Sequence, residues 1–240
     1  MFPATRPLDE SAIPTLLPRS SDFRRRLRAQ PLGTDTLAGA TRLSSLDPHL
    51  LQDLQRFESR ARAGEGLEVL EVLAAVLRHG RPLRLMVEHR SHVLPLTALP
   101  RQHELWAPVS AADWEAMDWS ALRVLQVEPA PDRAFAQIPG ATATPLGSVL
   151  WALALQGARA ELLPEIAGPA AYRIAPSTDL GALRLTGALA NTLTRLQRQG
   201  ASLEDIARWP GMSRERASRL LNGLYLQAGL IVSRAHPSAS

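Results

Sequence analysis

The stretch DIARWPGMSRERASRLL, from Asp205 to Leu221, decides the fold of the C-terminal part of this chain. Ser202 precedes it and Asp205 follows that serine by three residues, which is the spacing of a helix-capping box. The pair Pro-Gly at 210–211 interrupts the first helix, and glycine accepts the positive φ that tight turns often need. Ser213 can then cap a second helix. The stretch therefore predicts two helices joined by a short turn.

Apolar residues on both sides of the turn recur at helical spacing. Ala217, Leu220, Leu221 and Leu224 are three or four residues apart, so they form one buried face of the second helix. The preceding segment, LTGALANTLTRLQRQG (185–200), has an apolar stripe with the same spacing and ends at a glycine. We therefore expect a third helix there, which completes a core of three helices.

These residues resemble a known DNA-binding pattern, the helix-turn-helix I-A-x3-G-[apolar]-S-x3-A-x2-L. The matching positions are Ile206, Ala207, Gly211, Met212, Ser213, Ala217 and Leu220. The ending LYLQAGLIVSR is similar to winged-helix domains, in which the second helix runs into a glycine and then an apolar strand that begins the wing. Only AHPSAS follows, so we expect no room for a second wing strand. The resemblance covers about residues 185–234.

The resemblance implies that the second helix presents an outer face to the major groove of DNA. This face, which we call the reading face, comprises Ser213, Arg214, Glu215, Ser218, Arg219 and Asn222. Arginine pairs with guanine and asparagine with adenine, so Arg214, Arg219 and Asn222 are the expected base readers. Four further arginines, which we call the turn arginines, are expected to contact phosphates: Arg195, Arg198, Arg208 and Arg216. Two alternatives stay open, namely a protein contact and a plain solvated face.

The distribution of charge supports a charged partner for the same region. The chain has no lysine, so all 27 basic residues are arginine, and the formal net charge is +4. Residues 184–240 hold 8 arginines and 3 acidic residues, a net of +5, whereas residues 1–183 hold 19 and 20, a net of −1. This asymmetry favours a polyanionic or acidic partner, either DNA or an acidic protein.

The sequence predicts an α+β fold: an N-terminal mixed α/β domain with a small antiparallel sheet, and a C-terminal tri-helical winged-helix-like domain. Residues 1–45 have many prolines and arginines, including FRRRLR (23–28), and are expected to be a flexible arm. Residues 129–145 are rich in Pro, Ala and Thr and are expected to be a linker. The expected parts are therefore an arm (1–45), an α+β domain (46–128), a linker (129–145), a helical region ending in the winged-helix-like domain (146–234) and a tail (235–240).

Within residues 46–128, helices are expected at 47–62 and 67–80. Strands are expected at 82–89, 92–99, 103–109 and 121–128, with a short helix capped by Ser110 before the last strand. Tryptophans at 106, 114 and 119 surround this short helix. Core packing is the favoured interpretation for them, and an interface or apolar ligand pocket is the alternative.

No pattern in the chain indicates catalysis. His79, His89, His92 and His103 do not have the spacing of a known metal site, and there is no cysteine. There is also no glycine-rich phosphate loop and no G-x-S-x-G motif. We therefore expect no enzymatic activity, no cofactor and no metal.

No run of residues is apolar enough to span a membrane, and the start shows no secretory signal, so a cytoplasmic protein is expected. The sequence predicts a transcription regulator of the bacterial type that binds DNA through its C-terminal domain. Its N-terminal domain would sense a signal or form a homodimer. The alternative is a non-enzymatic adaptor whose winged-helix-like domain contacts an acidic protein partner or a second copy of the chain.

Overall fold

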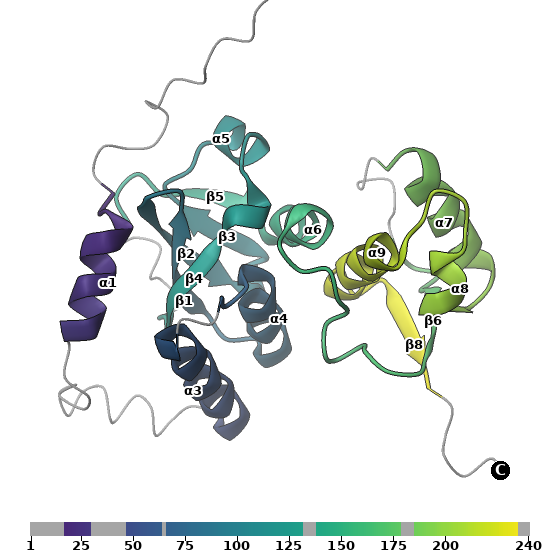
Figure 1. The fold of residues 1–240 in the computed structure, drawn as a ribbon, viewed down its shortest axis with the longest axis horizontal. Helices are drawn as coiled ribbons and strands as arrows, with labels where there is room; N and C mark the ends of the chain where they lie inside the picture. Colours follow the sequence, from purple (N-terminus) through teal and green to yellow (C-terminus); the bar gives the residue numbers. More distant parts are fainter. Residues whose placement is uncertain (1–16, 30–46, 64–65, 132–137, 179–184, 235–240) are drawn as a thin grey trace, which may run out of the picture.

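The computed structural model describes residues 17–29, 47–63, 66–131, 138–178 and 185–234. It is a mixed α+β structure with a five-stranded and a three-stranded antiparallel sheet (Figure 1). No helix of the described residues is both long enough and apolar enough to cross a bilayer. The helices are α1 (Ser20–Ala29), α3 (Pro48–Ala63), α4 (Val69–His79), η2 (Pro100–Gln102), α5 (Ala111–Glu115), η3 (Trp119–Ala121), α6 (Leu146–Gln156), α7 (Gly187–Arg198), α8 (Leu203–Ala207) and α9 (Arg214–Leu226). The strands are β1 (Leu83–His89), β2 (His92–Leu99), β3 (Glu104–Ala107), β4 (Arg123–Pro129), β5 (Thr142–Pro145), β6 (Ala171–Ile174), β7 (Ala201–Ser202) and β8 (Leu230–Ser233).

The five-stranded sheet has the order β4-β1-β2-β3-β5. The predicted hairpin is confirmed: β1 and β2 are joined by Arg90 and Ser91, and Arg90 takes a φ of +57° in the turn. Leu83, Leu85 and Val87 of β1 are fully buried and alternate with half-buried residues, as one core-facing side of a strand requires. This buried side joins the core made by α3, α4 and α6.

The two helices that precede the sheet begin and end where the sequence predicts. Asp47 Oδ1 accepts the His49 amide at 2.8 Å at the start of α3, and Gly80 closes α4 with a φ of +60°. Between the helices, the buried carboxylate of Glu71 accepts hydrogen bonds from Arg56 and Arg60 at 2.8–2.9 Å. The apolar helix α4 can therefore carry one acidic residue in its buried surface, because α3 supplies the opposite charge.

The segment predicted as a flexible arm contains a helix. Residues 20–29, with the basic cluster at 23–28, form α1 beside the β1–β2 turn (Figure 1). Its start is bound by backbone hydrogen bonds, since Ser20 N donates to Ser91 O and Val93 N to Pro18 O, both at 2.9 Å. No proline falls inside residues 20–29, so the prolines of this segment bound the helix rather than interrupt it. The rest of the arm, 1–16 and 30–45, lies outside the described residues.

The segment predicted as a linker contains a strand. Thr142–Pro145 form β5, which pairs with β3 and places Ala143 opposite Trp106. Thr142 Oγ1 also donates to Val109 O at 2.9 Å. Threonine favours strands, but the surrounding prolines and alanines outweigh that signal in the sequence. Residues 132–137 of the expected linker, like the tail at 235–240, lie outside the described residues.

Helix α6 lies between the two sheets and packs on both regions. It contacts α4, η3 and the five-stranded sheet on one side and α9 on the other (Figure 1). Its buried residues Val149, Leu150, Leu153 and Ala154 belong to one hydrophobic cluster that runs from Leu50 to Leu226. The N-terminal and C-terminal regions therefore share a continuous core across α6.

The C-terminal region combines α7, α8 and α9 with the sheet β7-β6-β8. Strand β6 precedes all three helices in the chain but lies between β7 and β8, pairing Tyr172 with both Ala201 and Val232. The sequence predicts no room for a second wing strand after β8, and residues 235–240 lie outside the described residues. It does not predict the partner that β8 does have, the upstream strand β6.

Candidate functional site

The α8–turn–α9 segment has the local geometry that its residues predict. Ser202 Oγ accepts the Asp205 amide at 3.2 Å and donates to the Asp205 carboxylate at 2.6 Å, which completes the capping box. Ser213 Oγ accepts the Arg216 amide at 3.2 Å at the start of α9. Gly211 has a φ of +74°, and a Cβ there would lie 2.7 Å from Ala188 Cβ on α7. Only glycine therefore allows the turn to approach α7 this closely.

The exposure predicted for the C-terminal half of the reading face is wrong. Ser218 and Asn222 have no exposed surface, and the Arg219 side chain is only 18% exposed. The physical reason is α6, which packs along this side of α9. Ser213, Arg214 and Glu215, in the first turn of α9, are exposed as expected. The structure thus divides the reading face into a buried part and an exposed part.

Asn222 fixes the segment that follows α6. Its Oδ1 accepts the Leu163 amide at 2.8 Å and its Nδ2 donates to Glu161 O at 2.9 Å. A buried amide side chain needs partners for both ends, and this backbone segment supplies them. Asn222 is therefore not available to hydrogen-bond a base in this conformation.

Two further side chains of this region hold α9 against α6. Arg219 donates to Leu155 O at 2.8 Å, and Gln227 donates to Gly147 O at 2.7 Å, near the two ends of α6. Between them, Gly223 meets Trp151: a Cβ at residue 223 would lie 2.6 Å from the tryptophan ring. This contact brings the two helices close together at a point where any side chain would clash.

Three acidic residues of the region each pair with one arginine. Glu204 pairs with Arg214, Asp205 with Arg208 at 3.4 Å, and Glu215 with Arg219 at 2.9 Å. The pKa of Asp205 is lowered, first by the hydrogen bond from the Ser202 hydroxyl and then by the Ser202 backbone amide. Each of the three acidic side chains of residues 185–234 therefore forms an ion pair with an arginine of the same region.

The turn arginines are all exposed. Contacts place two of them at the α8–α9 turn. The guanidinium of Arg195 lies 5.1 Å above the Trp209 ring, and Arg216 donates to Gly211 O. Arg198 follows Arg195 by one turn of α7. Within the described residues, Arg195, Arg198 and Arg216 form no ion pair with an acidic side chain. The turn arginines therefore carry most of the excess positive charge of this region.

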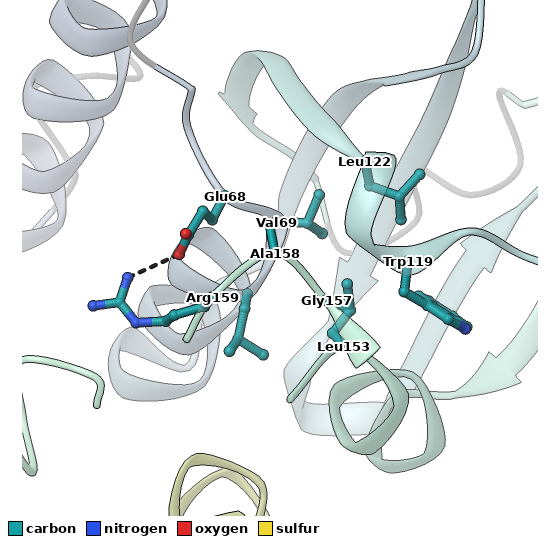
Figure 2. A pocket seen from close by; sticks show the side chains of 9 residues that line it. Glu68, Val69, Trp119, Leu122, Leu153, Gly157, Ala158 and Arg159 are labelled. Carbon is teal, nitrogen blue, oxygen red and sulfur yellow. Dashed lines mark hydrogen bonds and ion pairs between the residues drawn. The ribbon is translucent and has the colours of Figure 1, made fainter. Parts of the chain in front are cut away.

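Two hollows lie near α6 and α8 in the described parts of the chain. The smaller one, about 10 Å³, is lined by Trp119, Leu153 and the ion pair between Glu68 and Arg159 (Figure 2). Its volume is near that of a single water site, so it excludes a substrate or cofactor. The larger is a cleft of about 410 Å³ between residues 161–170 and the start of α8, with Arg214 on its wall.

The four histidines that the sequence singles out do not gather at one place. His79 Nε2 lies 2.8 Å from Asp53 Oδ2, His89 and His92 face each other across the β1–β2 turn, and His103 follows η2. Burial, followed by the charge of Arg90, lowers the pKa of His89. The described residues contain no group of three or more side chains placed to hold a metal ion.

The tryptophans beside α5 pack as the sequence favours. Trp114 and Trp119 are 6% exposed and their rings stack at 5.2 Å between centroids. Trp106, on β3, is half-buried and donates to Glu104 at 2.8 Å.

Comparisons of this chain with protein-family models, with curated proteins and with solved structures find no match. Sequence reasoning missed the contact between α6 and α9. One signal for it exists: Asn222 and Gly223 stand together among the leucines of the second half of α9, and a residue without a side chain beside a polar one suits a close helix crossing with a buried polar anchor.

Proposed function

We propose that this chain is a non-enzymatic adaptor, and that residues 185–234 act as a winged-helix-like module for protein contact. The burial of Ser218 and Asn222 against α6 and residues 161–163 is the observation that supports this most. A base-reading side chain must reach a base edge in the groove. In this conformation that side of α9 is covered by α6 and residues 161–163 of the same chain, so it is closed to a base edge.

The turn arginines are the proposed docking surface for the partner. They are exposed, and their planar guanidinium groups bind carboxylates in a bidentate manner. The cation–π contact with Trp209 orients Arg195 before a partner arrives. The chemistry of this surface fits an acidic protein segment.

A DNA-binding regulator is the second candidate function. It is favoured by the three turn arginines that have no acidic partner within the described residues, Arg195, Arg198 and Arg216. Arginines placed this way contact phosphates and position a protein on the duplex, but they do not read sequence. The N-terminal region would then supply sensing or dimerisation.

Binding of random duplex DNA distinguishes the two candidates. Fluorescence anisotropy with the full chain is measured at about 50 mM and about 200 mM salt, a range over which phosphate binding weakens steeply. The adaptor predicts no saturable binding at the higher salt. Saturable binding that is salt-dependent and lost in Arg195→Glu/Arg216→Glu would overturn the adaptor and favour the regulator.

Photocrosslinking in the source cells tests the adaptor directly. A benzophenone amino acid replaces Arg198 in one variant and the exposed Arg101, in the other region, in a matched control. We expect a discrete adduct with a protein only from position 198, and its loss when Arg195→Glu and Arg216→Glu are added. A nucleic-acid adduct, or equal adducts from both positions, would contradict the proposal.

A further inference from the structure

The outer edge of β8 differs from the other sheet edges in the described residues. The β4 edge is covered at Val124, whose amide donates to Leu67 O at 3.0 Å. The β5 edge ends in Pro145, and β7 is only two residues long. Short strands, proline and covering segments are the usual ways in which proteins protect an edge. β8 has four residues, Leu-Ile-Val-Ser, with no charge and no proline.

β8 also carries an exposed apolar side chain. Ile231 is 42% exposed, and it is the one large apolar residue of the described chain that is exposed. It lies on the outer face of the small sheet opposite Arg173, whereas Val232 faces the core opposite Tyr172. An apolar side chain on an unprotected edge is typical of a strand that pairs with another strand.

The hydrogen-bond pattern shows which backbone groups the edge offers. Ala175 N donates to Gly229 O at 2.9 Å, in register with the pairing of β6 and β8. Antiparallel bonds alternate along a strand, so Ile231 and Ser233 bond towards β6. The N–H and C=O groups of Leu230 and Val232 consequently point to the open side. None of the backbone hydrogen bonds outside the sheets and helices of the described chain reaches them.

We propose that this edge pairs with the β8 edge of a second copy of the chain, antiparallel and with a two-fold axis at Ile231. In that register Leu230 and Val232 of the two copies exchange backbone hydrogen bonds, and Ile231 faces its own counterpart. Residues 229–233, Gly-Leu-Ile-Val-Ser, are small, apolar, apolar, apolar and small. The axis therefore places apolar residues against apolar ones and small against small, as an isologous contact requires.

The charges near the edge and the small contact area indicate how strongly a second copy of the chain would bind there. Arg173 on β6 and Arg234, directly after β8, are exposed cations near this edge. Across the axis the two copies of Arg173 lie three strand spacings apart, about 14 Å, and the two copies of Arg234 lie six residues of strand apart, about 20 Å. Both separations exceed the screening length of about 8 Å. Like charges therefore do not oppose the pairing, and β8 itself offers no charge to recognise an acidic strand. The contact is much smaller than the roughly 1,200 Å² of a stable interface. The dimer is consequently weak and reversible, and it does not depend on the adaptor role.

Sedimentation equilibrium of the full chain from about 10 µM to about 500 µM tests the dimer. We expect a reversible monomer–dimer equilibrium. Val232→Pro, which removes an edge N–H, and Ile231→Lys should each raise the dissociation constant at least about tenfold. Ala171→Lys, on the outer face but on the central strand, is the matched control and should leave it unchanged.

Hydrogen exchange gives a second readout that does not depend on a variant. Protection of the Leu230 and Val232 amides should rise with protein concentration, while that of the Ile231 amide should not. A chain that stays monomeric over the whole range would overturn the proposal. So would a dimer that is unaffected by Val232→Pro and Ile231→Lys in variants with wild-type circular dichroism.

Discussion

Helix α9 has two stretches that share one motif but meet different surroundings. From Ala217 to Leu226 it is almost entirely buried, and α9 packs against α6, α8 and β8. From Arg214 to Arg216 it is exposed, and its charges contact only neighbouring turns. The residues of the α8–turn–α9 segment therefore define how the two helices cross, whereas the rest of the chain decides which face of α9 remains open.

The largest effect is expected from Asn222→Ala in the buried stretch. The change leaves Leu163 N and Glu161 O without their partners, and each unpaired buried group costs about 1–3 kcal/mol. We expect the free energy of unfolding to fall by about 2–4 kcal/mol in urea titrations followed by circular dichroism. Asn191→Ala, on the exposed side of α7, should change it by less than about 0.5 kcal/mol. Equal losses in both variants would mean that Asn222 is not an anchor.

The next effect is expected from Gly223→Ala. The new Cβ would lie 2.6 Å from the Trp151 ring, and overpacking of this kind costs about 1–3 kcal/mol. Adding Trp151→Leu should recover part of that loss, so the double variant is more stable than the sum of the singles predicts. Gly200→Ala is the control, because its Cβ would have no neighbour nearer than 3.8 Å. Additive losses would show that the two helices do not meet at this point.

A smaller effect is expected in the exposed stretch. Arg214 and Glu204 form an ion pair, but their side chains are 56% and 62% exposed. Exposed pairs contribute little, because water screens the charges and two long side chains must be ordered. Arg214→Ala should lower the free energy of unfolding by less than about 1 kcal/mol, and a double-mutant cycle with Glu204→Ala should give a coupling within that limit. A coupling free energy as large as the loss expected for Asn222→Ala would show that the exposed stretch contributes as much to stability as the buried one.

The smallest effect is a pH dependence at the cap of α8. The folded pKa of Asp205 lies below its ordinary value of 3.8, so the unfolded chain binds the proton more readily. The resulting stability is present above pH 3.8 and is lost as the pH falls through the folded pKa. The difference in unfolding free energy between wild type and Asp205→Asn should therefore shrink on acidification from about pH 5 to about pH 2.5. A difference that stays constant would assign the stability to the shape of the side chain rather than its charge.

Local signals predicted most of the elements, because capping residues and apolar periodicity act over a few neighbours. The cap at Ser213 and the stripe that includes Leu220 are of this kind. Exposure of the reading face could not be predicted in the same way. It depends on α6, whose Trp151 lies more than sixty residues before Asn222 in the sequence. An amphipathic pattern shows that a helix has an inner face, but not that a second element covers its outer face.

The position of β6 has a consequence for the order of folding during synthesis. Tyr172 emerges from the ribosome well before its cross-strand partner Val232, so β6 must wait for nearly the whole C-terminal region. Contacts this distant in sequence slow folding, because the intervening chain has to close before they form. The five-stranded sheet, whose first hairpin is local, can form earlier. We therefore expect nascent chains that end before β8 to hold a folded N-terminal sheet and a β6 strand whose only available partner in the sheet is the two-residue β7. Pairing of β8 with β6 is then the last step in the folding of the C-terminal region.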